Sequence, residues 1–443
     1  MSAGNARHAR LLELAEFPVR ELRFGGTLQY AGGALEVAEA ELVELASRDP
    51  RILEAGLDIV RPGERVRVTG IRDVVEPRVK VGGDTQVFPG ITSPVAPVGR
   101  GRTHRLTGMT LITTAAYEGT IRTGTTAQRS AILDMWGPGA DLSGFSRVPS
   151  LVLNLRLPSD LIEAEAHQVI QAAEYRVAQR LAETTAAAEP ANVETFGAAH
   201  GNADLPKAVV IVGCITESEH LPTGLGYYGL PVRESLATVV HPNELMDGAV
   251  TGNTLKTIAY YPTTWDWQNQ PLAMRLSREH GKRVDFAGVI LQRIRFEVFR
   301  EKEVAAHNAS QVARALGADA ALITWLGSGN AFLEVMLTVR ACEEKGIRTV
   351  LVTYEYGGQE GIDSPLLFYD THADAVVSTG SRDRILELPP ADRVAGAYRE
   401  LQVLNYPGAP VVSALDAITL DATDAIIGGT DLWGARDWTC RAH

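Results

Sequence analysis

Apolar and polar residues alternate over much of the first third of the chain, which is the pattern of β-strands with one buried face. Val19 to Val37 alternates about a glycine-rich centre and predicts a β-hairpin or meander. Ala38 to Ser47 predicts a short helix, and the valine-rich stretch from Leu57 to about Val98 predicts sheet with long connections. Leu106 to Ala116 and Ser150 to Leu155 each predict a further strand. The first part of the chain is therefore expected to be rich in β-structure.

The pattern then changes to helical spacing. Apolar residues recur every three or four positions from Ser159, the expected N-cap, to Ala186, which predicts a long amphipathic helix. Upstream of it, Gly137-Pro138-Gly139 predicts an exposed loop. The stretch from Thr184 to Pro206 is rich in Ala, Pro, Asn and Gly and predicts a linker. The apolar run Ala208 to Gly213 predicts a buried strand.

Strand and helix patterns alternate from Val284 onward. The expected elements are a strand over Val284–Leu291, a helix over Glu301–Leu316, a strand over Ala320–Trp325, a helix over Phe332–Lys345, and strands over Thr349–Tyr354 and Ala375–Ser378. Such alternation is typical of a doubly wound, mostly parallel sheet. Ala391 to His443 predicts a helix with irregular packing.

These patterns predict an α/β fold, with a β-rich mixed α+β N-terminal half and a doubly wound, mostly parallel α/β C-terminal half. The expected organisation is a β-rich domain over residues 1–158, a long helix and linker over 159–206, and an α/β domain over 207–443.

Composition excludes several function classes. The chain has 443 residues, of which 45% are hydrophobic and 22% charged, as in ordinary globular proteins. A net charge of −12 argues against a nucleic-acid or anionic-membrane partner. The three cysteines (Cys214, Cys342 and Cys440) form no CxxC pair and the ten histidines no HExxH, so no metal site is predicted. No apolar stretch reaches the length of a signal or membrane span, so we expect a cytoplasmic protein.

The candidate chemistry centres on residues 241–262, and within them on Asn253-Thr254. A chain can cut itself there, because the Thr254 hydroxyl can attack the Asn253 carbonyl and replace the amide with a more labile ester. A helper base has to lie about 3 Å from the proton that it takes. The candidate helpers, all close in sequence, are Asp247, His241, Glu244, Lys256 and Thr257.

Substrate-binding candidates come from other places. Ligands of doubly wound sheets sit beyond the carboxyl ends of the strands, which points to the loops after two predicted strands. A pair of basic residues in the first half of the chain could hold an anion or a carboxylate. A passage rich in Gly and Tyr precedes residues 241–262 and supplies a further candidate. The candidates are Asn330, Glu355 and Gln359 in the loops, Arg102 and His104 in the basic pair, and Tyr228 in the Gly/Tyr-rich passage. Tight turns and backbone capping are the plainer explanations for Asn330 and His104.

A set of short motifs in a fixed order carries a resemblance to a known family. The motifs are Arg61-Pro62-Gly63-Glu64, Val74-x-Glu76-Pro77-Arg78-Val79-Lys80, Phe88-Pro89-Gly90, Gly101-Arg102-Thr103-His104, Asp204-Leu205-Pro206-Lys207, Met246-Asp247-Gly248-Ala249, Gly252-Asn253, His280-Gly281-Lys282 and Glu355-Tyr356-x-Gly358-Gln359-x-Gly361. The chain resembles the component B proprotein of glycine, sarcosine and betaine reductases, and more distantly the D-proline reductase proprotein. The likeness covers nearly the whole chain.

The resemblance implies a subunit that cuts itself before a cysteine and turns the new N-terminal residue into a pyruvoyl group. The ketone condenses with a substrate amine, and a selenocysteine or cysteine of a partner subunit then attacks the adjacent carbon, so that the amine is released reductively. Here Thr254 stands at the cysteine position. Its maturation would leave a 2-oxobutyryl group, one methyl larger than pyruvoyl, and its hydroxyl needs the help of a base.

Three outcomes remain open for Thr254. It matures to a ketoacyl group in a subunit, expected to be oligomeric, that acts on the C–N bond of a small amine or amino acid with a cysteine- or selenocysteine-containing partner. Alternatively, the ester is hydrolysed and leaves an N-terminal threonine nucleophile, as in an amide hydrolase or acyl transferase. In the third outcome the chain stays whole and serves as a binding or scaffold subunit.

Overall fold

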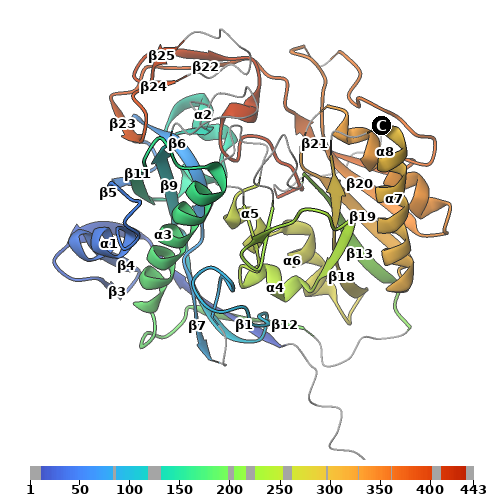
Figure 1. Cartoon of the computed structure of the whole chain (residues 1–443), viewed down its shortest axis with the longest axis horizontal. Helices are drawn as coiled ribbons and strands as arrows, with labels where there is room; N and C mark the ends of the chain where they lie inside the picture. The colour runs from blue at the N-terminus through green and yellow to red at the C-terminus, as the bar shows by residue number, and fades with distance from the viewer. Residues whose placement is uncertain are drawn as a thin grey trace, which may run out of the picture.

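The computed structural model describes residues 11–82, 86–117, 131–197, 204–215, 225–252, 262–295, 298–327, 329–360, 362–401 and 411–435. The predicted α/β class is confirmed, because helices accompany sheets that mix parallel and antiparallel strands. Figure 1 shows a first half in blue and green beside a second half in yellow and orange, with α4, α5 and α6 between their main sheets. The described residues between 386 and 420, in red, lie over the first half, whereas Leu432 and Trp433 belong to the hydrophobic core of the second half.

The first half is built on two sheets and one long helix. A four-stranded sheet has the order β12-β1-β8-β7, formed by β1 Leu12–Pro18, β7 Arg78–Gly82, β8 Gly101–Thr107 and β12 Asn192–Phe196. A larger sheet has the order β10-β6-β9-β11-β5, formed by β5 Glu54–Val60, β6 Val66–Val75, β9 Thr110–Ala116, β10 Ala131–Asp134 and β11 Ser150–Arg156. A small sheet holds β2 Glu21–Gly25, β4 Ala34–Ala38 and β3 Gln29–Ala31, followed by α1 Glu39–Ala46.

Helix α3, Glu163–Glu183, covers the first half because one of its faces is apolar. Its residues Val169, Ile170, Ala173 and Val177 follow helical spacing and are fully buried. The same face packs against β7, β8 and β9, so the helix bridges the two larger sheets. This position brings the polar residues of its buried face to the centre of the molecule.

The second half is a six-stranded sheet with the order β16-β18-β13-β19-β20-β21. Its strands are β13 Lys207–Ile215, β16 Ala237–Val240, β18 Asp285–Ile294, β19 Ala320–Trp325, β20 Arg348–Glu355 and β21 Val376–Ser381. All neighbours are parallel except β16 and β18. Helices α7 Phe299–Ala315 and α8 Ala331–Glu343 cover one face, and α6 Pro271–Glu279 lies on the other side (Figure 1). The first strand in sequence, β13, therefore lies inside the sheet, between two later strands.

Short elements connect the halves. Before the second sheet is complete, the chain forms β14 Gly226–Tyr227, β15 Leu230–Pro231, α4 Pro242–Met246, β17 Val250–Thr251 and α5 Thr264–Gln268. Beyond residue 386 it forms β22 Leu386–Leu388, β23 Arg393–Gly396, β24 Glu400–Leu401, β25 Val412–Ser413, β26 Ile418–Leu420 and a 3-10 turn over Thr423–Ala425. Strand β23 pairs in parallel with β6, so the end of the chain extends the large sheet of the first half.

Several element predictions need correction. Gly137-Pro138-Gly139 is not an exposed loop but begins α2, Gly137–Leu142, because proline fits the first helical turn. The predicted strand Leu106–Ala116 is two strands that separate at Gly108, whose φ of 73° favours glycine. The long helix begins at Glu163 rather than near Ser159.

The predicted linker and the predicted C-terminal helix also differ. Part of the predicted linker forms β12, which pairs antiparallel with β1, from Leu12 opposite Phe196 to Glu16 opposite Asn192. Among the described residues beyond Ala391 the structure has short strands and a 3-10 turn in place of a helix. The remaining predicted helices and strands match observed elements to within a few residues. The proposed domain boundaries stay a prediction.

Candidate functional site

The two ends of the predicted cleavage segment meet in the centre of the molecule. The Gly252 N–H donates to Thr264 Oγ1 at 2.9 Å, and Gln171 Nε2 donates to the Gly252 carbonyl at 3.3 Å. A side chain on Gly252 would start 2.9 Å from the Pro262 carbonyl oxygen and 3.1 Å from the Thr264 nitrogen, so only glycine fits this close approach. The chain therefore leaves at residue 252 and returns at residue 262 to the same place.

Four predicted positions lie in the segment between these ends. They are Asn253, Thr254, Lys256 and Thr257, and all fall within residues 253–261, outside the described residues. The described residues on either side of this segment hold its two ends in place.

Asp73 is the centre of the buried polar group that holds these ends. Its Oδ1 accepts from the backbone N–H groups of Thr264 and Val74, both at 2.9 Å. Its Oδ2 accepts from Thr264 Oγ1 at 2.5 Å and from the Tyr175 hydroxyl at 3.5 Å. The pairing of β6 with β9 shifts register between Ile71 and Asp73, and such irregularities redirect side chains. We call Asp73, Gln171, Tyr175, Thr251 and Thr264 the Asp73 cluster.

Helix α3 supplies two members of the Asp73 cluster from successive turns. Gln171 Nε2 also donates to Thr251 Oγ1 at 3.1 Å, and the Tyr175 hydroxyl lies 2.9 Å from Thr264 Oγ1. The Tyr175 ring stacks on Phe88 with ring centroids 4.2 Å apart. Burial, together with the negative charges of Asp73 and Glu174, raises the pKa of the Tyr175 hydroxyl well above its ordinary value. The hydroxyl therefore stays protonated at neutral pH and can donate a hydrogen bond.

Asp247, a predicted helper, is held by contacts of its own. It is fully buried, and its carboxylate accepts from Lys80 Nζ, from Thr103 Oγ1 at 2.6 Å and from the Gly99 N–H at 2.7 Å. Burial lowers the pKa of the Lys80 ammonium, and the neighbouring Asp247 charge opposes that change. These contacts make Asp247 an anchor between α4 and β7, and its catalytic role stays a prediction.

His241 and Glu244 form a capping box at the start of α4. His241 Nδ1 accepts from the Asn243 N–H at 3.2 Å, and Glu244 Oε2 accepts from the His241 N–H at 2.9 Å. Tyr228, a substrate-binding candidate, donates its hydroxyl to Glu244 Oε1 at 3.1 Å. The structure thus brings Tyr228 and Glu244 together beside Asp247.

Arg102 and His104 both lie on β8 but have different surroundings, and their predicted role in binding an anion stays a prediction. Arg102 is exposed and bonds Glu13 at 2.8 Å. His104 is buried, with its Nδ1 2.9 Å from Thr185 Oγ1 and its ring 4.5 Å from that of Phe17. Burial and the Arg102 charge lower the pKa of His104.

Asn330, Glu355 and Gln359 lie at the carboxyl ends of β19 and β20, as the strand pattern predicts. Asn330 precedes α8, Glu355 ends β20, and Gln359 is exposed in the loop after it. The two loops meet where the Gly329 N–H donates to the Tyr356 hydroxyl at 3.3 Å. These candidates therefore share one edge of the second sheet and lie on elements other than those of the Asp73 cluster.

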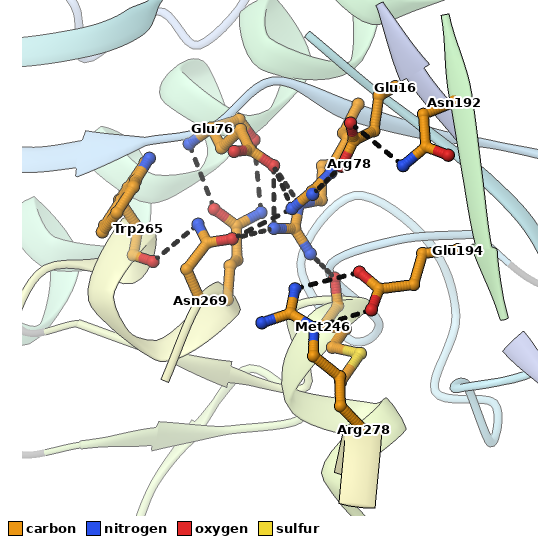
Figure 2. A network of polar contacts seen from close by, with 11 residues as sticks. Glu16, Glu76, Arg78, Asn192, Glu194, Met246, Trp265, Asn269 and Arg278 are labelled. Carbon is orange, nitrogen blue, oxygen red and sulfur yellow. Dashed lines mark hydrogen bonds and ion pairs between the residues drawn. The ribbon is translucent and has the colours of Figure 1, made fainter. Parts of the chain in front are cut away.

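A cavity of about 810 Å³ lies against the other side of α5, lined by residues of both halves. Figure 2 shows the polar network along one wall, where Asn269 Oδ1 accepts from Arg78 at 2.7 Å and Asn269 Nδ2 donates to the Trp265 carbonyl at 3.1 Å. Arg78 also bonds Glu76 at 2.9 Å and the Met246 carbonyl at 2.5 Å. These buried contacts fasten the chain on both sides of residues 253–261 to the first half.

The described part of the chain contains no group of three or more His, Cys, Asp or Glu side chains that could hold a metal ion. Within the same residues, no helix has both the length and the apolar character needed to cross a bilayer.

Comparison with known proteins decides the family. The model for glycine/sarcosine/betaine reductase component B subunits matches residues 10–441. The chain belongs to this family. It is 31% identical over 407 residues to the betaine reductase complex component B subunit alpha of Peptoclostridium acidaminophilum, covering 90% of this chain and 89% of that protein.

Two further component B relatives from the same organism show a similar likeness. The glycine reductase complex component B subunits alpha and beta are 31% identical to the chain, over 89% of this chain and 91% of that protein. The sarcosine reductase complex component B subunit alpha is 31% identical, over 90% of this chain and 92% of that protein. No solved structure matches the chain. The predicted resemblance to component B of these reductases is confirmed.

Sequence reasoning did not predict the Asp73 cluster. A usable signal was present, because Gln171 and Tyr175 are polar residues on the apolar face of a predicted amphipathic helix. Their spacing of four places them on one stripe. Asp73 and Thr264 had no such signal, because only the fold brings them to α3.

Proposed function

We propose that this component B family member is the substrate-binding subunit of a reductase complex that acts on the C–N bond of a small amine or amino acid. The names of the relatives support this proposal, because they describe subunits of reductase complexes. We further propose that the chain cuts itself between Asn253 and Thr254 and converts Thr254 into a 2-oxobutyryl group.

The hold of the Asp73 cluster on Gly252 is the observation that carries this proposal. Both backbone groups of Gly252 are bonded, its N–H to Thr264 and its carbonyl to Gln171. The next residue in the chain is Asn253, whose carbonyl would be attacked. Fixing the chain one residue before the reacting carbonyl restricts the approach of the nucleophile, and such positioning lowers reaction barriers. The Asp73 carboxylate supports this hold from within a water-excluded site.

The proposed maturation conserves atoms and needs no oxidant. The Thr254 Oγ attacks the Asn253 carbonyl carbon, the amide C–N bond breaks, and the proton of the hydroxyl passes to the freed amine, which gives an ester. Loss of the Thr254 α-proton then expels the Asn253 carboxylate and leaves an enamine. Tautomerisation and hydrolysis by one water release ammonia and leave the 2-oxobutyryl group.

The mature group would act with a partner. A ketoacyl carbonyl supplies an electron-withdrawing attachment point for the substrate amine and leaves the C–N bond open to attack by a thiol or selenol. Of this chain's thiols, Cys214 and Cys342 are buried, and burial raises the pKa of both, to about 12 for Cys342. The described thiols are therefore poor nucleophiles, which supports a cysteine- or selenocysteine-containing partner subunit.

Mass spectrometry of the denatured, purified protein tests the proposal. We expect two fragments that divide at Asn253-Thr254, with a C-terminal fragment that reacts with phenylhydrazine. The Thr254→Ala variant should give one uncleaved chain. A C-terminal fragment that begins with unmodified threonine would replace the ketoacyl proposal by the N-terminal nucleophile, and a full-length mass would contradict both.

A second function has one observation in its favour. The cavity of about 810 Å³ between the halves can hold a small molecule whether or not the chain is cut. An uncleaved binding subunit would use this cavity alone, and it is the function that a full-length mass would support.

A further inference from the structure

Two strained residues lie close to the chain that leads into the cleavage segment. Phe88, from the Phe88-Pro89-Gly90 motif, has a φ of 52°, and Tyr228 has a φ of 50°. In the described part of the chain they are the two residues other than glycine with a positive φ. Such a backbone costs free energy and persists only where the surrounding contacts over-determine it. Strained residues gather at functional sites, so the contacts of these two are informative.

Phe88 and Tyr228 belong to two segments that pack backbone against backbone. A side chain on Gly90 would collide with the Tyr228 carbonyl oxygen, and a Cβ on Gly229 would start 2.6 Å from the Gly90 carbonyl oxygen. Only glycine fits such close approaches. The two glycines therefore fix the two segments, and with them the strained residues, against each other.

Both strained residues also hold the chain just before Gly252. The Phe88 N–H donates to the Asp247 carbonyl at 3.0 Å, and the Tyr228 N–H donates to the Ala249 carbonyl at 2.8 Å. The next two residues form β17, and Gly252 follows directly. These contacts thus fix the direction in which the chain enters the segment that contains the candidate cleavage bond.

The Phe88 ring connects this part of the chain with α3. The ring is fully buried and stacks on the Tyr175 ring, with centroids 4.2 Å apart and planes 10° apart. A Cβ on Gly248 would start 2.5 Å from Phe88 Cδ1, so the ring also lies directly against the Gly248 backbone. One turn before Tyr175 on α3, Gln171 donates to the Gly252 carbonyl. The ring therefore sets the spacing between α3 and the chain that approaches Gly252.

We propose that Phe88 is a positioning residue of the cleavage site. Its ring keeps Tyr175 and Gly248 in register, so that the Asp73 cluster can hold Gly252 next to the residue whose carbonyl is attacked. Phe88 acts through these neighbours and needs no contact with the reacting atoms. The inference rests on the proposed self-cleavage, but the hold on Gly252 is measurable in a chain that is not cut.

Phe88→Leu keeps an apolar side chain and removes the stacked ring. In the uncleaved Thr254→Ala background, hydrogen exchange followed by mass spectrometry of overlapping peptides reports on the Gly252 amide, whose N–H is bonded to Thr264. We expect this amide to exchange about two- to tenfold faster, as for the loss of one aromatic pair. In the chain that keeps Thr254, cleavage should slow by a similar factor.

Phe332→Leu is the matched control. Phe332 is 1% exposed and lies on α8, where its ring centroid is 5.1 Å from that of Trp325. The variant loses an aromatic pair in the second half and keeps every contact of Phe88. It should lower the urea midpoint, as Phe88→Leu does, but it should change neither the exchange of Gly252 nor the rate of cleavage.

Gly248→Ala perturbs the same contact from the other side and serves as a second variant if Phe88→Leu fails to fold. Gly346→Ala is its control, because Gly248 and Gly346 have φ values of 76° and 74°, and a Cβ on Gly346 would meet no described atom within 4 Å. Both variants carry the same backbone strain. Only Gly248→Ala should speed the exchange of Gly252 and slow cleavage, because only its Cβ meets the Phe88 ring.

The measurements separate this proposal from the proposed function. Unchanged exchange of Gly252 in both site variants, or equal acceleration in the controls, would overturn the role of Phe88. Faster exchange without slower cleavage would overturn it as well. A wild-type chain that is not cut would contradict the proposed function instead. In that case faster exchange would still support the hold of Phe88 on Gly252, and unchanged exchange would still refute it.

Discussion

Thr264→Val is the sharpest test of the Asp73 cluster, because valine keeps the shape of threonine and removes only the hydroxyl. In the structure, Thr264 Oγ1 donates to Asp73 at 2.5 Å, accepts from the Gly252 N–H at 2.9 Å and lies 2.9 Å from the Tyr175 hydroxyl. All of these groups are buried, so water cannot easily replace the lost partner. Asp73 keeps the two backbone N–H groups that bond its Oδ1.

The expected loss follows from these contacts. A hydrogen bond to a charged group contributes about 1.5 to 3 kcal/mol and a neutral one about 1 kcal/mol, so the loss of one charged and two neutral bonds predicts a decrease of about 3.5 to 5 kcal/mol in unfolding free energy. If the hold on Gly252 also positions the cleavage site, a barrier increase of about 3 kcal/mol corresponds to about a hundredfold slower cleavage.

The assay follows cleavage of newly purified protein by mass spectrometry over time, with urea unfolding measured in the uncleaved Thr254→Ala background. Thr353→Val is the matched control. Thr353 is equally buried, and its hydroxyl bonds Trp325 Nε1 and the Tyr354 carbonyl, both at 2.9 Å. It should lose stability without slowing cleavage. Cleavage of Thr264→Val at the wild-type rate, or equal slowing in both variants, would refute the positioning argument.

Three further predictions follow from other contacts. Gly252→Ala should abolish cleavage and lower the unfolding temperature, because its Cβ would start 2.9 Å from the Pro262 carbonyl oxygen; normal cleavage would contradict this packing. Mass-mapped alkylation of the native protein at pH 7 should leave Cys214 and Cys342 unlabelled, since burial raises their pKa values, and rapid labelling of either would be the opposing result. Burial lowers the pKa of His104 in the folded protein, so its contribution to stability is intact above about pH 6.5 and declines as the pH falls towards the folded pKa. The variant His104→Gln should therefore show a smaller change in the urea midpoint between about pH 7 and pH 5 than the wild type. An unchanged pH dependence would exclude His104 as the titrating group.

The sequence predicted best those elements whose pattern is local. The second-sheet strand Ala320–Trp325 was predicted at its observed bounds because a mostly apolar run of this length is too short for a buried helix and typical of a buried strand. By contrast, β12 and β23 are partners of distant strands, and Asn192–Phe196 has mostly polar, accessible residues. Such strands form because a distant strand offers unpaired backbone groups to them. The hydrophobic pattern of the segment itself does not show that this partner exists.

The candidate site shows the same division. The segment around Asn253-Thr254 and its neighbour Asp247 were found from their motifs, and the structure places Asp247 in a buried ion pair. Asp73 was missed because its importance comes from Thr264, a residue 191 positions away. The sequence therefore identifies the peptide bond that is the candidate for cleavage, whereas the groups that hold its surroundings are brought together only by the fold.

The position of β13 has a consequence for the lifetime of the mature protein. If the chain is cut after residue 253, β13 belongs to one piece, while β18 and β19 on either side of it belong to the other. The later piece also contributes β23, which pairs with β6 of the earlier piece. Before the cut the two pieces fold as one chain. After the cut, refolding would require the two separate pieces to associate in solution. Maturation would thus make unfolding effectively one-way, and the durability of the mature protein would be set by its rate of unfolding rather than by an equilibrium.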